Sequence, residues 1–168
     1  ISEGAGEDPL LGALVAQARV RGFQGTDWGA PDTVLACAKH FAAYGAVQAG
    51  RDYNAVDMSE RLLREVCLPP FFAAKEAGVA SVMTAFSELN GTPATANRFL
   101  LRDILRNEWD FKGFVVSDFA SISEMVAHGS AGDDSEAGRQ ALKAGVDMDM
   151  QGGVYQQHLE RMVAERTI

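Results

Sequence analysis

Asp118 is the residue whose position indicates chemistry most directly. It ends the apolar run 113–117, which is typical of a strand buried on both faces. A carboxylate directly after such a strand lies at the edge of a sheet, where it can act as a nucleophile or a general base. The structural alternative is that Asp118 caps the next helix, and Ser121 and Ser123 compete with it for that role.

A lysine and a histidine are adjacent at the end of another apolar run, as Lys39 and His40. In a regular strand their side chains would point to opposite faces, so one would face a ligand and the other would support it. At the end of a strand both can turn toward the ligand. The alternatives are a structural role for His40 and, as in an aldolase-like barrel, a Schiff-base amine at Lys39.

Two further carboxylates, Asp147 and Asp149, alternate with methionines in the run 146–150. A period of two places them on one face, where a pair could bind a metal or transfer protons. No His or Cys stands at metal-ligand spacing, so we expect no metal site. We interpret His128, in a Gly-rich loop, and His158, on a helix, as surface residues.

These residues follow candidate strands that alternate with amphipathic stretches. The strands are predicted at 33–39, 80–86, 113–117 and 146–150. The alternation is typical of βα units around a parallel sheet, and about four units are present. A complete (β/α)₈ barrel needs eight, in about 250 residues. Because no glycine fingerprint of a nucleotide-binding loop follows a strand, the sequence favours roughly half of a barrel over an open α/β domain.

Capping residues mark the predicted helices. Asp8 is expected to begin the first helix and Gly22 to end it. Ser59 begins the second, which Pro69 should kink or split. Later helices are predicted after Asn97, over 135–144 and over 155–165.

Composition narrows the class of protein. The 168 residues, 47% hydrophobic and 23% charged, are typical of one globular domain. A formal net charge of −8 without a basic cluster argues against nucleic-acid partners. No apolar run approaches the roughly 18–20 residues that span a membrane. Cys37 and Cys67 are too few for a disulfide framework, and we expect small buried thiols. The chain lacks an initiating Met and a signal-peptide pattern, so we expect a segment of a longer protein.

Several segments, taken together and in order, resemble glycoside hydrolase family 3. The segments that carry the resemblance are 38–45, 50–54, 59–65, 68–71, 81–86, 90–91 and 113–118. They extend over nearly the whole chain with spacing that fits the family. One such motif would be weak, whereas the ordered series is specific.

The resemblance implies roles for individual residues. Asp118 matches the family's nucleophile, the aspartate that closes the Val-Val-Ser-Asp strand. Lys39 and His40 match the pair that hydrogen-bonds sugar hydroxyls in the first subsite. Met83 and Phe86 match positions that wall this subsite. Many relatives carry Tyr where Phe86 stands, so a hydroxyl near the nucleophile is missing here.

Two stretches bear on the branch of the family. In the hexosaminidase branch, Lys-His-Phe is followed by Pro-Gly-His-Gly, and the histidine of this second motif acts in catalysis. Residues 42–45 here read Ala-Ala-Tyr-Gly and lack that histidine. The stretch 50–54 looks like that of bacterial β-glucosidases, and we expect its Tyr53 to contact substrate. The resemblance therefore implies a β-glucosidase, with a β-xylosidase as the nearest alternative.

The implied reaction is hydrolysis of a β-glucoside or cello-oligosaccharide with retention, through a covalent glycosyl-aspartate and without a cofactor. The family's general acid/base, usually a Glu, belongs to a second domain, and the first half of the barrel supplies further sugar-binding residues. We expect the chain to need both as partners and to be inactive alone. The alternative from another class is a non-catalytic sugar-binding remnant. Periplasmic or secreted localisation is suggested by the family only.

Overall fold

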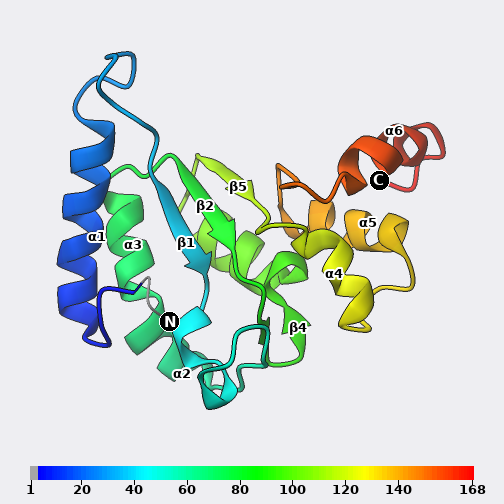
Figure 1. The fold of residues 1–168 in the computed structure, drawn as a ribbon, viewed down its shortest axis with the longest axis horizontal. Helices are drawn as coiled ribbons and strands as arrows, with labels where there is room; N and C mark the ends of the chain where they lie inside the picture. Colours follow the sequence, from blue (N-terminus) through cyan, green and yellow to red (C-terminus); the bar gives the residue numbers. More distant parts are fainter. Residues whose placement is uncertain (1–3) are drawn as a thin grey trace.

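A three-stranded parallel sheet forms the centre of the structure (Figure 1). The computed structural model describes residues 4–168. The sheet has the order β1 (Cys37–Phe41), β2 (Ser81–Thr84), β5 (Phe114–Val116). Ala38 is paired with Val82, and Met83 with Val116. Since all three strands run the same way, their C-terminal ends meet at one edge of the sheet.

Three of the four predicted strands are thus confirmed. β2 and β5 are shorter than predicted, and β1 is shifted, since it begins at Cys37 and extends two residues past the predicted end at residue 39. The fourth prediction, 146–150, is wrong as a regular strand, because this segment meets β5 through a single bridge between Val116 and Met148. The carboxylate of Asp147 accepts the backbone N–H of Val115 at 2.8 Å. The N–H groups of Asp147 and Met148 both donate to the carbonyl of Val115. The Asp147 side chain and the shared Val115 carbonyl therefore replace the regular hydrogen bonds between two paired strands.

Helices surround the sheet. Their bounds are α1 (Pro9–Gln24), α2 (Glu60–Leu62), the π-helical η3 (Leu63–Cys67), α3 (Pro69–Glu76), the π-helical η5 (Phe99–Glu108), α4 (Ser121–Ala127), α5 (Asp134–Ala144) and α6 (Val154–Ala164). Short 3₁₀ turns are η1 (Tyr44–Ala46), η2 (Gln48–Gly50) and η4 (Ala94–Ala96), and a small hairpin pairs β3 (Glu88–Leu89) with β4 (Thr92–Pro93). Helices α1 and α3 pack together next to β1, whereas α4, α5 and α6 lie beyond β5 (Figure 1).

The predicted caps begin the helices as expected. Side-chain oxygens of Asp8, Ser59 and Asn97 each accept the N–H group three residues on, at 2.8, 3.2 and 3.1 Å. A π-helical turn separates α2 from α3, which begins at Pro69, so the predicted split is confirmed. The predicted end of the first helix is wrong. A helix tolerates the glycine at position 22, and α1 ends only where Gly25 adopts a φ of 57°.

The core lies between the sheet and the helices. Phe41, at the end of β1, is fully buried, and its ring meets those of Phe71 and Trp109 edge-on at 5.1 and 6.0 Å. The helix η5 buries its predicted apolar face, which consists of Leu100, Leu101, Ile104 and Leu105.

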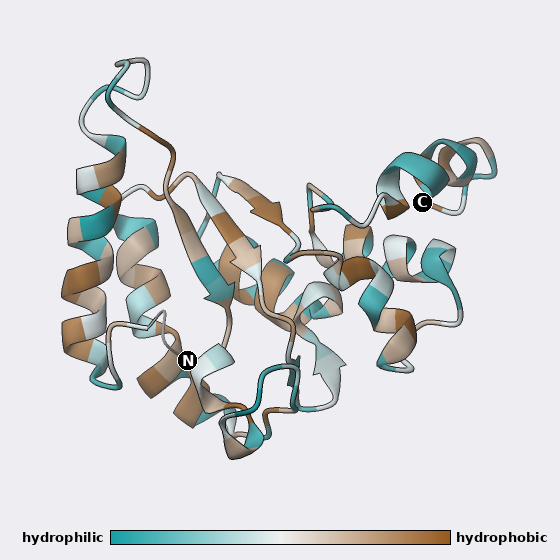
Figure 2. Cartoon of the chain, viewed as in Figure 1, coloured by the Kyte–Doolittle hydropathy of each residue, from teal (hydrophilic) through white to brown (hydrophobic). Residues whose placement is uncertain are grey.

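A second apolar face remains uncovered. In the described residues β1 is paired only with β2, so its outer edge carries no strand. Exposed hydrophobic side chains lie beside this edge on α1 and on the chain before β1, and the brown segments of α1 are visible in Figure 2. They are Leu10, Leu11, Leu14, Val34 and Leu35, which are 52–71% exposed. The three strands do not close into a barrel.

The cysteines are both free thiols, but the prediction that they are buried is wrong for Cys37, which is exposed at the start of β1. Cys67 is half-buried. None of the helices in the described part of the chain is long and apolar enough to cross a membrane.

Gly113→Ala is expected to destabilise the protein strongly. A Cβ at position 113 would overlap the carbonyl oxygen of Ala80 and the ring of Phe111, so β5 would have to move away from β2. We expect a loss of about 2 kcal/mol or more, measured by thermal unfolding followed by circular dichroism. The matched control is Gly22→Ala, where a Cβ meets nothing within 4 Å. Because Gly22 lies within α1, this variant should gain about 0.5–1 kcal/mol. Equal unfolding temperatures for the two variants would contradict the close approach of the strands.

Candidate active site

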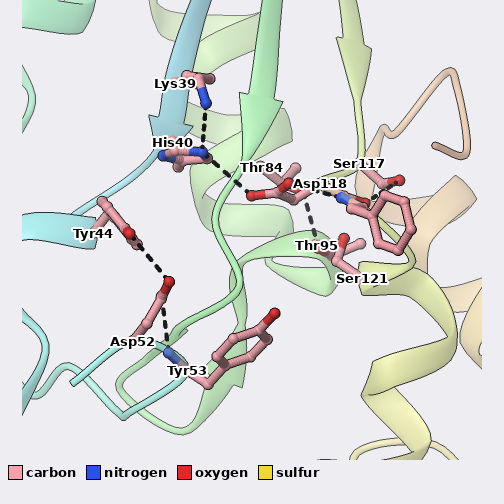
Figure 3. A network of polar contacts seen from close by, with 11 residues as sticks. Lys39, His40, Tyr44, Asp52, Tyr53, Thr84, Thr95, Ser117, Asp118 and Ser121 are labelled. Atoms are coloured by element: carbon pink, nitrogen blue, oxygen red, sulfur yellow. Dashed lines mark hydrogen bonds and ion pairs between the residues drawn. The ribbon is translucent and has the colours of Figure 1, made fainter. Parts of the chain in front are cut away.

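The ends of the three strands bring together the residues that the sequence singled out. Lys39 Nζ lies 3.1 Å from His40 Nε2, and His40 Nε2 lies 3.4 Å from Asp118 Oδ2 (Figure 3). Strand β2 separates β1 from β5, so these groups bridge a distance of two strand spacings, about 10 Å. Only the long side chains of Lys39 and His40 allow the three polar groups to meet.

The pairing of β1 explains why Lys39 and His40 lie together. The register between β1 and β2 is irregular between Ala38 and Phe41, where the regular alternation of side chains is interrupted. Lys39 and His40 therefore both turn toward Asp118, as the sequence allowed for a strand end. The side chain of His40 is 10% exposed, and its ring lies 4.7 Å from that of Tyr44.

Asp118 is 7% exposed, and its two carboxylate oxygens differ in environment. The backbone N–H of Phe119 donates to Oδ1 at 2.7 Å. Oδ2 accepts no hydrogen bond from the described residues and faces His40. The alternative that Asp118 caps α4 is wrong, because Ala120 stands at the cap position and no side chain caps that helix. One oxygen is thus fixed, while the other is left for a ligand.

The turn that carries Asp118 is held from one side by the segment 148–150. Ser117 Oγ donates to the carbonyl of Asp118 at 3.0 Å and accepts the N–H of Met150 at 2.8 Å. The N–H of Ala120 donates to the carbonyl of Met150 at 2.8 Å. The backbone of Asp118 is therefore fixed by groups outside its own strand.

A row of buried hydroxyls lies on the other side of the same turn. Thr84 Oγ1 is 3.0 Å from Thr95 Oγ1, which is 3.0 Å from Ser121 Oγ (Figure 3). Sequence reasoning missed this row. Thr84 lies within a segment that carried the family resemblance, and Ser121 was considered only as a helix cap, but nothing in the sequence linked either of them to Thr95.

Met83 and Phe86 lie on and just after β2. Met83 is half-buried and pairs with Val116, two residues before Asp118. The ring of Phe86 lies 4.4 Å from that of Tyr53, with 31° between the ring planes. Tyr53 is 47% exposed. Its partial burial raises the pKa of its hydroxyl, and the negative charges of Glu124, Asp52 and Asp118 raise this pKa further. Tyr53 and Phe86 thus form an aromatic wall near the carboxylates.

The loop before α2 presents Tyr53 through contacts that sequence reasoning also missed. Asp52 accepts the hydroxyl of Tyr44 at 3.1 Å and the N–H of Tyr53 at 3.0 Å. Asn90 clamps the far end of the loop, since its side chain both accepts from and donates to the backbone of Met58 at 2.9 Å. The signal in the sequence was that Asp52 and Asn90 both lie in segments that resembled the family.

Comparison with known proteins agrees with this arrangement. The family model described as the Glycosyl hydrolase family 3 N terminal domain matches residues 2–167. The chain belongs to glycoside hydrolase family 3. A periplasmic β-glucosidase of Salmonella typhimurium is 46% identical over 162 residues, which cover 96% of this chain. A β-xylosidase of Formosa agariphila is 47% identical over 154 residues, which cover 89%.

Solved structures of family 3 enzymes have the same fold. The β-glucosidase of Listeria innocua, in complex with isofagomine and in complex with glucose, aligns over 99% of this chain with a TM-score of 0.96 and 41% identity. The chain spans 21% of the length of the Salmonella and Formosa relatives and 24% of the Listeria chain. It is therefore a mixed α/β portion of a family 3 N-terminal domain.

Asp147 and Asp149, in the fourth predicted strand, do not lie with Lys39, His40 and Asp118. Asp147 pairs with Arg106 at 2.7 Å, and Asp149 accepts the N–H groups of Val154 and Tyr155 at the start of α6. Both carboxylates thus have structural partners. Among the described residues, no group of three His, Cys, Asp or Glu side chains is arranged to hold a metal.

The interpretation of His128 as a surface residue is wrong. Its side chain is 16% exposed and lies 3.1 Å from Glu88 Oε1. Glu124, one turn earlier on α4, has a buried Oε2 without a hydrogen-bond partner among the described residues. Burial raises the pKa of Glu124, as do the charges of Asp118 and Asp52, while His128 opposes the shift.

Glu124→Gln is expected to stabilise the protein at neutral pH. The pKa of Glu124 is higher in the folded state than in the unfolded state. As the pH rises, the carboxyl therefore loses its proton in the unfolded state first, near the ordinary pKa of a glutamate. The stability of the parent protein therefore falls relative to the variant above about pH 4.5. We expect a gain in the free energy of unfolding at pH 7 that disappears near pH 4, measured by urea unfolding at several pH values. The control is Glu160→Gln on the exposed face of α6, and an equal pH-dependent gain in it would contradict the assignment.

Proposed function

We propose that this chain forms part of the catalytic unit of a retaining β-glucosidase in which Asp118 is the nucleophile. The observation that carries the proposal is the environment of the Asp118 carboxylate. One oxygen is fixed by the N–H of Phe119, and the other faces His40 and Lys39 at the common edge of the sheet. Membership of family 3 supports the same reaction class.

The first chemical step is attack on the sugar. Asp118 Oδ2 forms a bond to the anomeric carbon while the bond from that carbon to the leaving oxygen breaks. A carboxylic acid about 5–5.5 Å away protonates the leaving oxygen. In the second step the same group, now a carboxylate, takes a proton from water, which attacks the anomeric carbon and frees Asp118. We assign that second carboxyl to a part of the complete enzyme outside this chain.

Lys39 and His40 donate hydrogen bonds to the hydroxyls of the substrate. Lys39 offers three N–H donors and His40 one donor, and both lie within reach of a sugar placed on Asp118. Hydrogen bonds to hydroxyls that strengthen in the oxocarbenium-like transition state lower the barrier.

Met83, Phe86 and Tyr53 form the apolar wall of the sugar site. The tilted rings of Tyr53 and Phe86 offer a flat surface to the C–H face of a sugar ring, and the exposed hydroxyl of Tyr53 keeps a polar end in water. Phe86 adds no hydrogen bond to the nucleophile. Substrate orientation would then depend on Lys39 and His40.

The proposal includes the completion of the fold. We place residues 1–168 in roughly the C-terminal half of a (β/α)₈ barrel, and the general acid/base on a second domain of the same enzyme. The uncovered edge of β1 and the exposed apolar residues of α1 support this, since neighbouring strands and helices would cover them. Hollows of about 500 and 420 Å³ lie elsewhere, and neither is lined by Asp118. An enclosed sugar pocket would therefore need the remaining chain.

A β-xylosidase is the second candidate, because the Formosa relative of that name is 47% identical. The two substrates differ by the hydroxymethyl group of glucose. The ratio of kcat/KM for aryl β-glucoside and aryl β-xyloside in the complete enzyme separates them. A ratio above one supports the glucosidase, and a ratio below one supports the xylosidase.

Asp118→Ala in the complete enzyme is expected to lower kcat by about 10⁴-fold or more, because no covalent intermediate can form. The unsubstituted enzyme should carry one sugar on Asp118 after incubation with a 2-deoxy-2-fluoro-β-glucosyl inactivator, as measured by peptide mass mapping. The matched control is Asp103→Asn on the exposed side of η5, which should keep full activity. An adduct on another residue, or near-native activity of Asp118→Ala, would refute the assignment.

The 168-residue chain alone is expected to show no turnover of aryl β-glucosides and to self-associate. The uncovered edge of β1 and the apolar face of α1 favour contacts between copies. Size-exclusion chromatography with light scattering measures the state, and co-expression with the rest of a family 3 enzyme should reduce the association. A monomeric, active chain would contradict the proposed half-barrel.

A further inference from the structure

The three buried hydroxyls beside Asp118 connect separate elements of the fold. Thr84 is the last residue of β2, Thr95 lies in η4, and Ser121 is the first residue of α4. They are 0%, 1% and 4% exposed. Each neighbouring pair of hydroxyl oxygens is 3.0 Å apart, so Thr95 is bonded to both of the others. We call these three residues the hydroxyl chain.

Packing alone does not account for the hydroxyl chain. Ala94 and Ile122, the chain neighbours of Thr95 and Ser121, are also fully buried, so the hydroxyl chain lies in the interior of the fold. A valine has nearly the volume of threonine and would fill the site of Thr95 without a polar group that must be satisfied. Hydroxyls add direction, because each hydrogen bond fixes a distance and an angle between two elements.

The hydroxyl chain ends on the turn that carries Asp118. The backbone N–H of Ser121 donates to the carbonyl of Asp118 at 3.1 Å, while its side chain bonds to Thr95. On the opposite side, Ser117 bonds the same turn to the segment 148–150. Ser117 thus joins the turn to the segment 148–150, whereas the hydroxyl chain joins it to β2, the strand that carries Met83 (Figure 3).

We propose that Thr84, Thr95 and Ser121 are positioning residues that hold the Asp118 turn in the orientation needed for attack on the sugar. The inference rests on the proposed role of Asp118 as nucleophile. A turn released on one side would let the carboxylate rotate away from the anomeric carbon, and a displacement of about 1 Å can cost about 10²-fold in rate. Binding of the sugar depends on Lys39 and His40 on β1, so it should change little.

The test uses the complete enzyme and the 2-deoxy-2-fluoro-β-glucosyl inactivator, whose reaction with Asp118 reports attack directly. Thr95→Val keeps the shape of the side chain and removes both hydrogen bonds. We expect the first-order rate constant of labelling to fall by about 10–100-fold, while the dissociation constant of the inactivator stays within about threefold. Thr95→Ser keeps the hydroxyl and should restore the labelling rate.

Ser81→Ala is the matched control for stability. Ser81 is also 4% exposed, and its hydroxyl donates to the carbonyl of Ala36 at 3.1 Å, at the opposite end of β2. This variant should lose thermal stability comparable to that of Thr95→Val and label at the parent rate. If Thr95→Val does not fold, Ser121→Ala, which removes a single terminal bond, takes its place with the same expected loss.

Three results overturn the proposal, and the two that refute only the positioning role are distinguishable from the one that also refutes the proposed function. A label on Asp118 that forms at the parent rate in Thr95→Val, or a loss of rate that Thr95→Ser does not restore, refutes the positioning role and leaves the nucleophile assignment intact. A parent enzyme that carries no label on Asp118 refutes the proposed function, and the positioning role with it.

Discussion

The close pairing of β5 with β2 is the constraint on which the rest of the site depends. The N–H of Phe114 reaches the carbonyl of Ala80 at 3.2 Å because residue 113 has no side chain to keep the strands apart. This pairing sets Met83 opposite Val116 and thereby fixes how far Asp118 extends past the edge of the sheet. β1 and β5 are not paired with each other, so β2, which lies between them, sets the spacing between the strand of His40 and the strand that leads to Asp118.

Polar contacts around the turn after β5 fix the position of Asp118. A buried carboxylate is costly unless charges or hydrogen bonds compensate it. Here compensation comes from the N–H of Phe119 and from the polar side chains of His40, beside Oδ2, and of Lys39, beside His40. The turn itself is held by Ser117 on one side and by the hydroxyl chain on the other. The rigidity of the site thus comes from short polar contacts, whereas the apolar core holds the strands in place.

The third feature is the contrast between a well-packed interior and an open outer edge. The residues of η5 that face the core are fully buried, while those of α1 and of the chain before β1 remain exposed. Hydrophobic surface that recurs at helical spacing, beside an unpaired strand, is expected where further strands and helices pack. The family 3 relatives, several times longer than this chain, have ample length to supply them.

The sequence by itself determined the strands that end in polar residues, the helix caps at Asp8, Ser59 and Asn97, and the family. The strand ends and the caps depend on neighbours within a few residues, so local patterns contain them, whereas the family follows from the ordered series of segments along the chain. It misjudged the segment 146–150 and the end of α1, where a side chain and a glycine conformation replaced the regular pattern.

Only the tertiary structure decided which polar groups meet. Lys39 and His40 could have faced opposite ways, and an irregular register turned both toward Asp118. Asp147 and Asp149 were also candidates for chemistry, but they became partners of Arg106 and of the start of α6. The hydroxyl chain joins residues 11 and 26 positions apart. Contacts of that kind depend on how separate elements pack, and no local pattern of residue types specifies the distance between two side chains.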